Sequence, residues 1–133
     1  HFPPAGTQPD YVNTWPLHCI AGTEGAKYHP NLDESLIDVH IKKGQGANGY
    51  SIFEGTTESD QSFLELLNHK HISAVDVVGI ATDYCVRASA LDAVRSGIET
   101  RVISSLTAGV SPSSVEKAID ELIDSGVTVV AEA

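Results

Sequence analysis

The sequence predicts an α/β fold built on a mainly parallel sheet, and three observations indicate it. Apolar runs rich in β-branched residues alternate with amphipathic stretches from residue 62 onward. The run Ala74 to Ile80 is almost continuously apolar, which is typical of a strand in a parallel sheet covered on both faces. Short loops join the runs, as in right-handed strand-helix-strand units. We therefore expect three layers, α/β/α.

Two elements are expected upstream of this strand. The segment Leu36 to Ile41 alternates between apolar and polar residues, which predicts a strand. Phe63, Leu66 and Leu67 share one side of a helical turn and therefore indicate a short helix.

A helix is expected directly after the strand that ends at Ile80. Thr82 is suited to cap it, because a threonine hydroxyl can accept a hydrogen bond from the first turn. Gly97 ends this helix, since glycine readily takes the left-handed conformation found after helix C-termini. The next strand is Thr100 to Ser105. Four apolar residues at helical spacing form the buried face of the helix: Val86, Ala90, Leu91 and Val94.

The last part of the chain predicts one more helix and one more strand. Ser111-Pro112 opens the helix with proline at its first position, and Ser113 with Glu116 forms a candidate capping box. Gly126 ends the helix, and Val127 to Ala131 is the last strand.

Length and charge restrict the class of function. The 133 residues are about one domain long, so we assign 1–133 to a single domain. Eight basic and 18 acidic residues give a net charge of -10, which disfavours nucleic acids and anionic membranes as partners and favours a small neutral ligand. No apolar run approaches the roughly 20 residues of a membrane-spanning helix, and no secretory start is present. These features predict a cytoplasmic protein.

Residues 1–33 differ from the rest of the chain. They contain most of the prolines and show little periodicity, while their aromatic residues argue against disorder. We interpret this segment as a functional loop. The chain begins at His1 rather than at a methionine, which we interpret as the start of a processed or truncated polypeptide.

Cys85 is the strongest candidate for chemistry. Ligands of open α/β sheets collect beyond the carboxyl ends of the strands, and the strand ending at Ile80 delivers Cys85 to that edge. In the first turn of a helix, backbone amides and the helix dipole favour a thiolate and can hold an oxyanion. The alternative is a small buried hydrophobic residue. Cys19 is the other cysteine, and we interpret both as thiols.

Four separated segments resemble one family in order and spacing. They are PDYVNTWPLHCIAGTEGAKYHP, KKGQGANGYSIFEG, GIATDYCVRASALDAVRSG and LTAGVSPSSVEKAIDEL. Together they resemble the bacterial nicotinamidase/pyrazinamidase family, within the isochorismatase-like cysteine hydrolases, over essentially the whole chain. The resemblance implies hydrolysis of nicotinamide, and of pyrazinamide as an analogue, to the acid and ammonia. Nicotinamide hydrolysis belongs to NAD salvage and pyridine nucleotide biosynthesis.

The resemblance also implies roles for individual residues. Cys85 would be the nucleophile that forms a thioester with the carboxamide carbon, and Lys43 would lie beside it and stabilise the thiolate and the oxyanion. The peptide bond Ile80-Ala81 would be cis. The backbone N–H groups of Ala81 and Cys85 would then form the oxyanion hole.

Four residues match positions of the family's substrate site. Trp15 and Tyr50 would flank the aromatic ring of the substrate, where stacking contributes about 1 kcal/mol beyond buried area. Ile80 and Tyr84 would also border the substrate. Tyr84 stands where mycobacterial-type members often have histidine, so the polarity of the pocket is left open.

His1 and His18 match two metal ligands of the family, although their spacing specifies no metal by itself. The resemblance implies one divalent ion, and Zn, Fe and Mn all accept histidine with carboxylate. The family's other protein ligands, from a D-x-H motif, and its catalytic aspartate on the first strand would precede His1. We therefore expect 1–133 to be the C-terminal two-thirds of the domain, with 1–33 as the metal and substrate loop, and the N-terminal strands to lie in a missing segment of the same protein.

Two alternatives remain open. The chain could belong to another C–N hydrolase of the same superfamily, acting on a ureido or carbamoyl amide. It could also be a noncatalytic α/β subunit whose cysteine is structural. Homo-oligomerisation is likewise left open by the sequence.

Overall fold

The computed structural model describes residues 1–46 and 48–132. Backbone contacts divide the chain into two compact units, His1–Asp38 and Val39–Ala133, and each is described by itself. Whether the two form the predicted single domain stays a prediction. The described residues of the first unit hold 3₁₀ turns at Glu24–Ala26 and Glu34–Leu36. No helix in the described part of the chain has the length and apolarity needed to cross a membrane.

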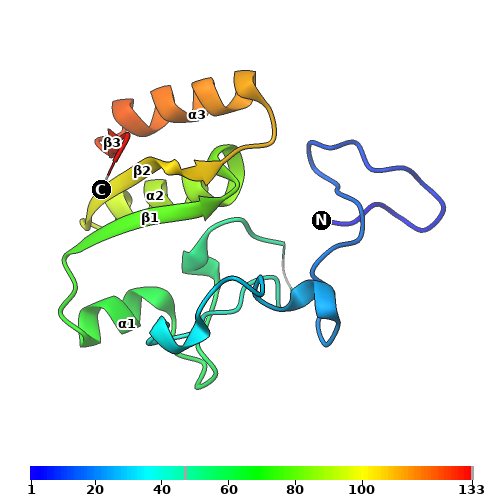
Figure 1. Ribbon diagram of the computed structural model, residues 1–133, viewed down its shortest axis with the longest axis horizontal. Helices are drawn as coiled ribbons and strands as arrows, with labels where there is room; N and C mark the ends of the chain where they lie inside the picture. Colours follow the sequence, from blue (N-terminus) through cyan, green and yellow to red (C-terminus); the bar gives the residue numbers. More distant parts are fainter. Residues whose placement is uncertain (47, 133) are drawn as a thin grey trace. The chain divides into compact units, whose positions relative to one another are not determined.

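The second unit contains a parallel sheet of three strands (Figure 1). They are β1 (Ala74–Ile80), β2 (Glu99–Ala108) and β3 (Thr128–Val130), in the spatial order β1-β2-β3. The predicted α/β class and parallel sheet are confirmed. β2 continues three residues beyond the predicted end, because the last residues of β1, Gly79 and Ile80, pair with Thr107 and Ala108.

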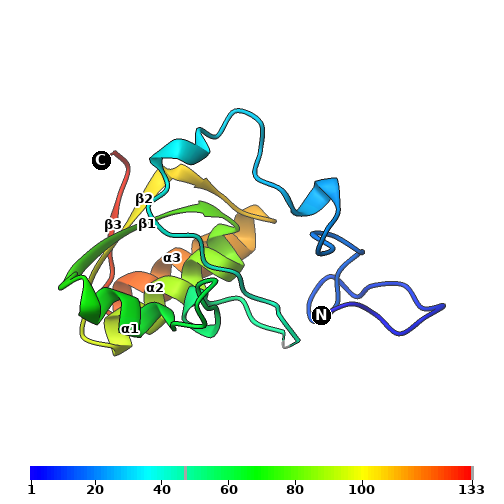
Figure 2. The same ribbon diagram turned by 90° about the horizontal axis from the view of Figure 1, so that it is seen from below.

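Three helices accompany the sheet: α1 (Phe63–His69), α2 (Arg87–Arg95) and α3 (Pro112–Asp124). Figure 2 shows α2 and α3 on the same side of the sheet. Right-handed crossovers that move in one direction along a sheet place successive helices on one face. The main core therefore lies between these helices and that face, and it consists of Val86, Ala90, Leu91, Val102, Leu122 and Val127.

The other face of the sheet is largely open among the described residues. Along β1 the side chains alternate strictly between exposed and half-buried, and Val78 and Ile80 are exposed. The near-continuous apolarity of β1 suggested cover on both faces, but the helices described here supply one layer only. Their common side follows from the uniform direction of the two crossovers.

The predicted strand Leu36 to Ile41 is wrong. The carboxylate of Asp33 accepts a hydrogen bond from the backbone N–H of Ser35, and this local bond begins the 3₁₀ turn that ends at Leu36. Such side-chain bonds compete with extended pairing. The only ladder contact near this segment is an isolated antiparallel bridge between Lys42 and Thr56, as far as the described residues show.

Most of the predicted signals at the ends of α3 and at the end of α2 are confirmed. Ser111 caps α3 by accepting from the N–H of Ser114, and Pro112 occupies the first helical position as predicted. The capping box expected at Ser113 and Glu116 is wrong, because Ser113 already lies inside the first turn. Both terminating glycines have positive φ: 78° at Gly97 and 91° at Gly126.

Candidate active site

Cys85 lies in a widened helical turn that leaves the end of β1. The turn is a single π-helical segment, Thr82–Val86, in which the N–H groups of Tyr84 and Val86 both donate to the carbonyl of Ala81 at 3.0 Å. The peptide bond Ile80-Ala81 is cis, as expected from the resemblance.

The predicted cap at Thr82 is wrong. Ala81 occupies the cap position and contributes no side-chain hydrogen bond, while Thr82 is buried. The bond from Val86 to Ala81 spans five residues, so the turn widens before α2 begins at Arg87. Cys85 therefore precedes α2 instead of standing in its first α-helical turn.

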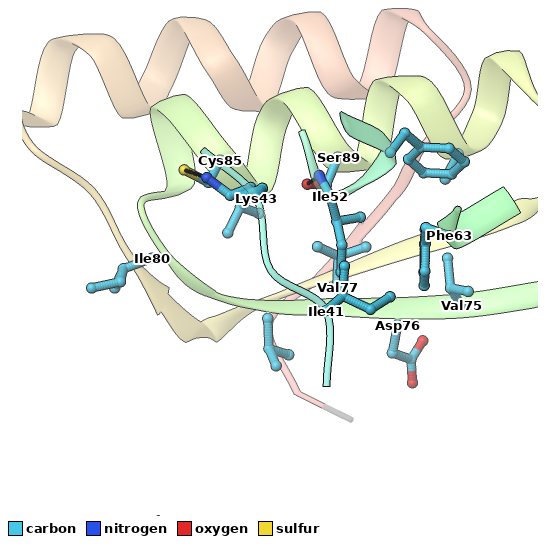
Figure 3. Close-up of a pocket in the computed structure, with 14 residues that line it drawn as sticks. Ile41, Lys43, Ile52, Phe63, Val75, Asp76, Val77, Ile80, Cys85 and Ser89 are labelled. Atoms are coloured by element: carbon cyan, nitrogen blue, oxygen red, sulfur yellow. Dashed lines mark hydrogen bonds between the residues drawn. The ribbon is translucent and has the colours of Figure 1, made fainter. Parts of the chain in front are cut away.

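Lys43 contacts Cys85 from a distant segment of the same unit. Its Nζ lies 3.4 Å from Sγ of Cys85 and donates to the carbonyl of Gly49 at 3.2 Å. Figure 3 shows the amine and the sulfur facing each other at one end of a pocket. The predicted proximity is confirmed. The ammonium group of Lys43 can stabilise a negative charge on the sulfur or on the oxygen of a carbonyl group that the sulfur attacks.

The pocket itself has a volume of about 370 Å³ and extends from this pair along β1 (Figure 3). Away from Cys85 and Lys43 its lining is mostly apolar, and it includes Ile41, Ile52, Phe63, Val75 and Val77. The reactive pair thus stands at the end of a largely apolar space, where charge on sulfur or nitrogen is screened less than in open water.

Two of the predicted substrate residues pack against each other. The rings of Tyr50 and Tyr84 have centroids 5.3 Å apart and planes tilted by 53°. Burial raises the pKa of Tyr84, and the negative charges of Asp83 and of an ionised Tyr50 add to this effect. The Tyr84 hydroxyl is protonated at neutral pH even at its ordinary pKa of 10.0, and the shift keeps it a hydrogen-bond donor to higher pH. Ile80, the third such residue in this unit, is 76% exposed.

Asp83 is the residue that sequence reasoning missed. It is 5% exposed, and its carboxylate accepts from the backbone N–H groups of Val110 and Ser111 and from the hydroxyl of Ser114. Burial would raise the pKa of Asp83, but these hydrogen bonds outweigh burial and leave the pKa below its usual value. The available signal was an acidic residue three positions after an apolar strand, which in most sequences is simply solvated.

His1 and His18 lie side by side in the first unit. Their Nε2 atoms are 3.1 Å apart, and Nδ1 of His18 is 2.6 Å from the carbonyl oxygen of Pro16. A carbonyl only accepts, so Nδ1 carries the hydrogen and Nε2 keeps its lone pair. Two nitrogens bound to one tetrahedral Zn²⁺ would be roughly 3.3 Å apart, so the pair fits such an ion. No group of three or more metal-ligating side chains occurs among residues 1–46 and 48–132.

Trp15 is placed next to this histidine pair. Its backbone N–H donates to the carbonyl of His1 at 2.9 Å, and its ring packs edge-on against Tyr11 with centroids 6.1 Å apart. The predicted pairing of Trp15 with Tyr50 around a substrate stays a prediction.

The sequence has close relatives among characterised amidases. The nicotinamidase/pyrazinamidase of Mycobacterium tuberculosis is 48% identical over 130 residues, which cover 98% of this chain and 68% of that protein. The nicotinamidase of Acinetobacter baylyi is 35% identical over 85% of this chain and 55% of its own length. The chain therefore spans between about half and two thirds of these relatives.

Solved structures give the same result. A nicotinamidase/pyrazinamidase of Acinetobacter baumanii superposes with a TM-score of 0.82 at 36% identity, over 95% of this chain and 67% of that one. An L. infantum protein in complex with nicotinate has a TM-score of 0.78 at 34% identity, over 87% and 60%. The pyrazinamidase of Pyrococcus horikoshii in complex with zinc has a TM-score of 0.72 at 33% identity, over 87% and 62%.

These relatives confirm the predicted enzyme class: the chain belongs to a family of hydrolases that act on amides. The sequence profile of the isochorismatase domain matches residues 6–133, nearly the entire chain. This match and the 48% identity to the Mycobacterium tuberculosis protein show that the chain belongs to the isochorismatase domain family.

Proposed function

We propose that this chain carries the nucleophile of an amidase that hydrolyses nicotinamide, and pyrazinamide as an analogue, to the carboxylic acid and ammonia. The observation that carries the proposal is the 3.4 Å contact between Nζ of Lys43 and Sγ of Cys85 at the carboxyl end of β1. The similarity to nicotinamidases supports the choice of substrate. The reaction would serve NAD salvage, and the cytoplasmic location predicted from the sequence is part of the same proposal.

The reaction is nucleophilic substitution at the carboxamide carbon. Sγ of Cys85 bonds to this carbon, the C–N bond breaks, and ammonia leaves after taking up a proton. Water then attacks the thioester, releases the acid and returns a proton to sulfur. The resemblance assigns the transfer of these protons to an aspartate that is not among residues 1–133, so the experiments use the full-length protein.

The negative charge that develops on the carboxamide oxygen needs donors in fixed positions. We assign the backbone N–H groups of Ala81 and Cys85 to this role, because the resemblance implies it and both residues belong to the backbone that leaves the end of β1. Lys43 stands within reach of the same region and adds positive charge there. Its second hydrogen bond, to the carbonyl of Gly49, holds the amine in place before substrate binds.

The aromatic ring of the substrate would bind through aromatic side chains. Tyr84, within the turn Thr82–Val86 (the cysteine turn), already forms a ring pair with Tyr50, and Trp15 is half-buried in the first unit. Flat heteroaromatic rings gain about 0.5–1.5 kcal/mol from such contacts beyond area burial. The complex of the L. infantum relative with nicotinate supports a pyridine carboxamide as the ligand class.

We assign one divalent metal ion, Zn, Fe or Mn, to His1 and His18. The convergence of their Nε2 atoms supports the assignment, and the zinc complex of the Pyrococcus horikoshii relative is consistent with it. When bound, the ion would supply a positive centre that accepts a neutral nitrogen or oxygen donor. The contact between His18 and Pro16 orients one imidazole for this role.

Substitution of the nucleophile tests the proposal. Cys85→Ala in the full-length protein should abolish ammonia release from nicotinamide and leave metal content unchanged, since no proposed ligand is altered. Cys19→Ala is the matched control, because Cys19 is the other free thiol and is exposed. Full activity in the Cys85→Ala protein would reject the assignment of the nucleophile.

Two further measurements separate the alternatives. A panel containing nicotinamide, pyrazinamide, and ureido and carbamoyl amides distinguishes a nicotinamidase from another C–N hydrolase of the superfamily. For a noncatalytic subunit, Cys85 should react with iodoacetamide at neutral pH no faster than Cys19. Preferential alkylation of Cys85 would exclude that alternative.

A further inference from the structure

We propose that Asp83 is a positioning residue for the reaction: its carboxylate ties the turn Thr82–Val86 to the first turn of α3 and thereby sets where the sulfur of Cys85 lies. The inference rests on the proposed function, because it concerns the nucleophile of that reaction. It adds a residue that touches neither substrate nor the reacting atoms.

The contacts of Asp83 join two parts of the chain that are far apart in sequence. Val110 donates its N–H to both carboxylate oxygens, at 3.1 and 3.2 Å, and Ser111 donates to Oδ2 at 3.4 Å. The hydroxyl of Ser114 also donates to Oδ2. Ser114 lies in the first turn of α3, and Val110 and Ser111 lie just before it, where the helix dipole favours a negative charge. The carboxylate is thus a buried cross-link between the cysteine turn and α3.

A second link attaches the backbone of the same residue to the same helix. Nε of Arg87 donates to the carbonyl of Asp83 at 3.2 Å, and its guanidinium pairs with Glu121 of α3 at 2.6 Å. The turn has no side-chain cap at Ala81. Val86 anchors its far end in the core, and Asp83 attaches it to the start of α3 two positions before Cys85.

The amine that faces the sulfur is held by a different set of contacts. Lys43 donates to the carbonyl of Gly49, and the N–H of Ile52 donates to the hydroxyl of Ser89 on α2 at 3.0 Å. The Sγ–Nζ distance thus depends on the attachment of the cysteine turn to the start of α3 and on the attachment of the Lys43 segment to Gly49 and α2. Loss of the Asp83 contacts would shift the sulfur relative to the amine, because these contacts act on the turn that carries Cys85.

Packing around Asp83 leaves little room for the carboxylate to move. A Cβ at Gly109 would lie 2.0 Å from Cγ2 of Val115 and 3.2 Å from Oδ1 of Asp83. Both side-chain oxygens at position 83 also have to accept hydrogen bonds, because donors point at each of them. A carboxylate only accepts, whereas an asparagine in either orientation would turn its NH₂ group toward Val110 or toward Ser111 and Ser114.

The test compares Asp83→Asn, Ser114→Ala and Ser114→Thr with the wild type in the full-length protein. The readouts are kcat and KM for nicotinamide and the rate at which iodoacetamide alkylates Cys85 in the folded protein. We expect Asp83→Asn to lower kcat at least about tenfold with KM changed less than about threefold, and to slow alkylation severalfold. Ser114→Ala should give a smaller change in the same direction, and Ser114→Thr should restore the wild-type values because it keeps the hydroxyl.

The control is Asp92→Asn, which removes a carboxylate from α2 that pairs with Arg95 at the surface. It should leave both readouts unchanged. A purely structural role for Asp83 would lower the melting temperature of Asp83→Asn but leave kcat and the alkylation rate at wild-type values, and that result would overturn the inference. If Asp83→Asn does not fold, equal kcat and alkylation rates in Ser114→Ala and Ser114→Thr overturn it instead.

Failure of the proposed function has a different signature. A wild-type protein that releases no ammonia from nicotinamide contradicts the function, while the alkylation rates of the variants still decide whether Asp83 positions Cys85.

Discussion

Nζ of Lys43 and Sγ of Cys85 lie 3.4 Å apart although 42 positions separate them in the chain. The amine comes from an irregular segment next to the Lys42–Thr56 bridge, and the sulfur comes from the turn after β1. Two separate backbone segments therefore have to be placed accurately for the contact to exist. The predictions below test the contact, the elements that hold it, and the stability of the fold around it.

Removing the amine should impair chemistry more than binding. We expect Lys43→Ala to lower kcat by about 100-fold or more, because a preorganised positive charge beside the nucleophile and the oxyanion is lost. Lys42→Ala is the matched control, because Lys42 is the adjacent lysine. Its amine is largely exposed and forms a long ion pair with Glu58 at 4.0 Å. Steady-state kinetics with nicotinamide check both variants, and equal losses in the two would contradict a specific role for Lys43.

A methyl group at Gly49 should disturb the support of Lys43. A Cβ there would lie 2.2 Å from Oε2 of Glu54, whose carboxylate also accepts from the N–H of Ser51. The atoms in the way are all at the flexible end of Glu54, so this side chain can turn aside at the expense of its capping bond to Ser51. We expect Gly49→Ala to reduce kcat only about two- to fivefold, whereas Gly25→Ala, where the nearest atom would be 3.9 Å away, should have no effect.

Loss of one imidazole should remove the metal. We expect His18→Ala to lower the metal bound per chain to a small fraction of the wild-type stoichiometry, because a pair of converging nitrogens becomes a single one. His29→Ala changes an exposed histidine of the same unit and should retain the metal. Elemental analysis of the dialysed proteins measures both, and an unchanged stoichiometry in His18→Ala would count against the ligand assignment.

Acid should selectively weaken the contribution of Asp83 to stability. The pKa of this carboxyl lies below its ordinary value of 3.8 in the folded protein, so its ionised form stabilises the fold at neutral pH. This contribution is fully present above about pH 5 and is lost as the pH falls through the lowered pKa. At pH 7, Asp83→Asn should cost about 1–3 kcal/mol of unfolding free energy.

The difference between the wild type and Asp83→Asn should therefore shrink below pH 4. Urea unfolding of both proteins at several pH values between 3 and 7 measures it. A difference that stays constant over this range would show that the charge of Asp83 contributes nothing to folding.

Adjacent residues on α3 should differ strongly in their effect on stability. Leu122 is fully buried in the core, and Leu122→Ala should cost about 2–5 kcal/mol because it leaves a cavity. Ile123, its neighbour, is 54% exposed, and Ile123→Ala should cost less than about 1 kcal/mol. Chemical denaturation measures both, and similar losses would contradict the described orientation of α3.

Much of the local structure follows from short stretches of sequence. The strand Ala74–Ile80 has the predicted bounds, and α2 and α3 end at the glycines expected to end them. Backbone preferences and the spacing of apolar residues depend on a few neighbouring positions, so one short segment is enough to predict its own secondary structure. The same logic failed at Leu36 to Ile41, because Leu36 ends a 3₁₀ turn begun at Asp33 and the residues after it lack ladder partners in the described structure.

By itself the sequence determined the α/β class, the strand that delivers Cys85, and, through its resemblance, Lys43, Ile80-Ala81 and the histidine pair as candidates. Only the tertiary structure decided the rest. In it the amine of Lys43 lies beside the sulfur of Cys85, the cysteine turn is a π-helical segment, and Asp83 is buried against the start of α3. The π segment is closed by short-range bonds from Tyr84 and Val86 to Ala81, which the residue pattern did not indicate. The contacts of Lys43 with Cys85 and of Asp83 with Val110 join residues 42 and 27 positions apart, and they arise from how the elements pack together, which no local pattern records.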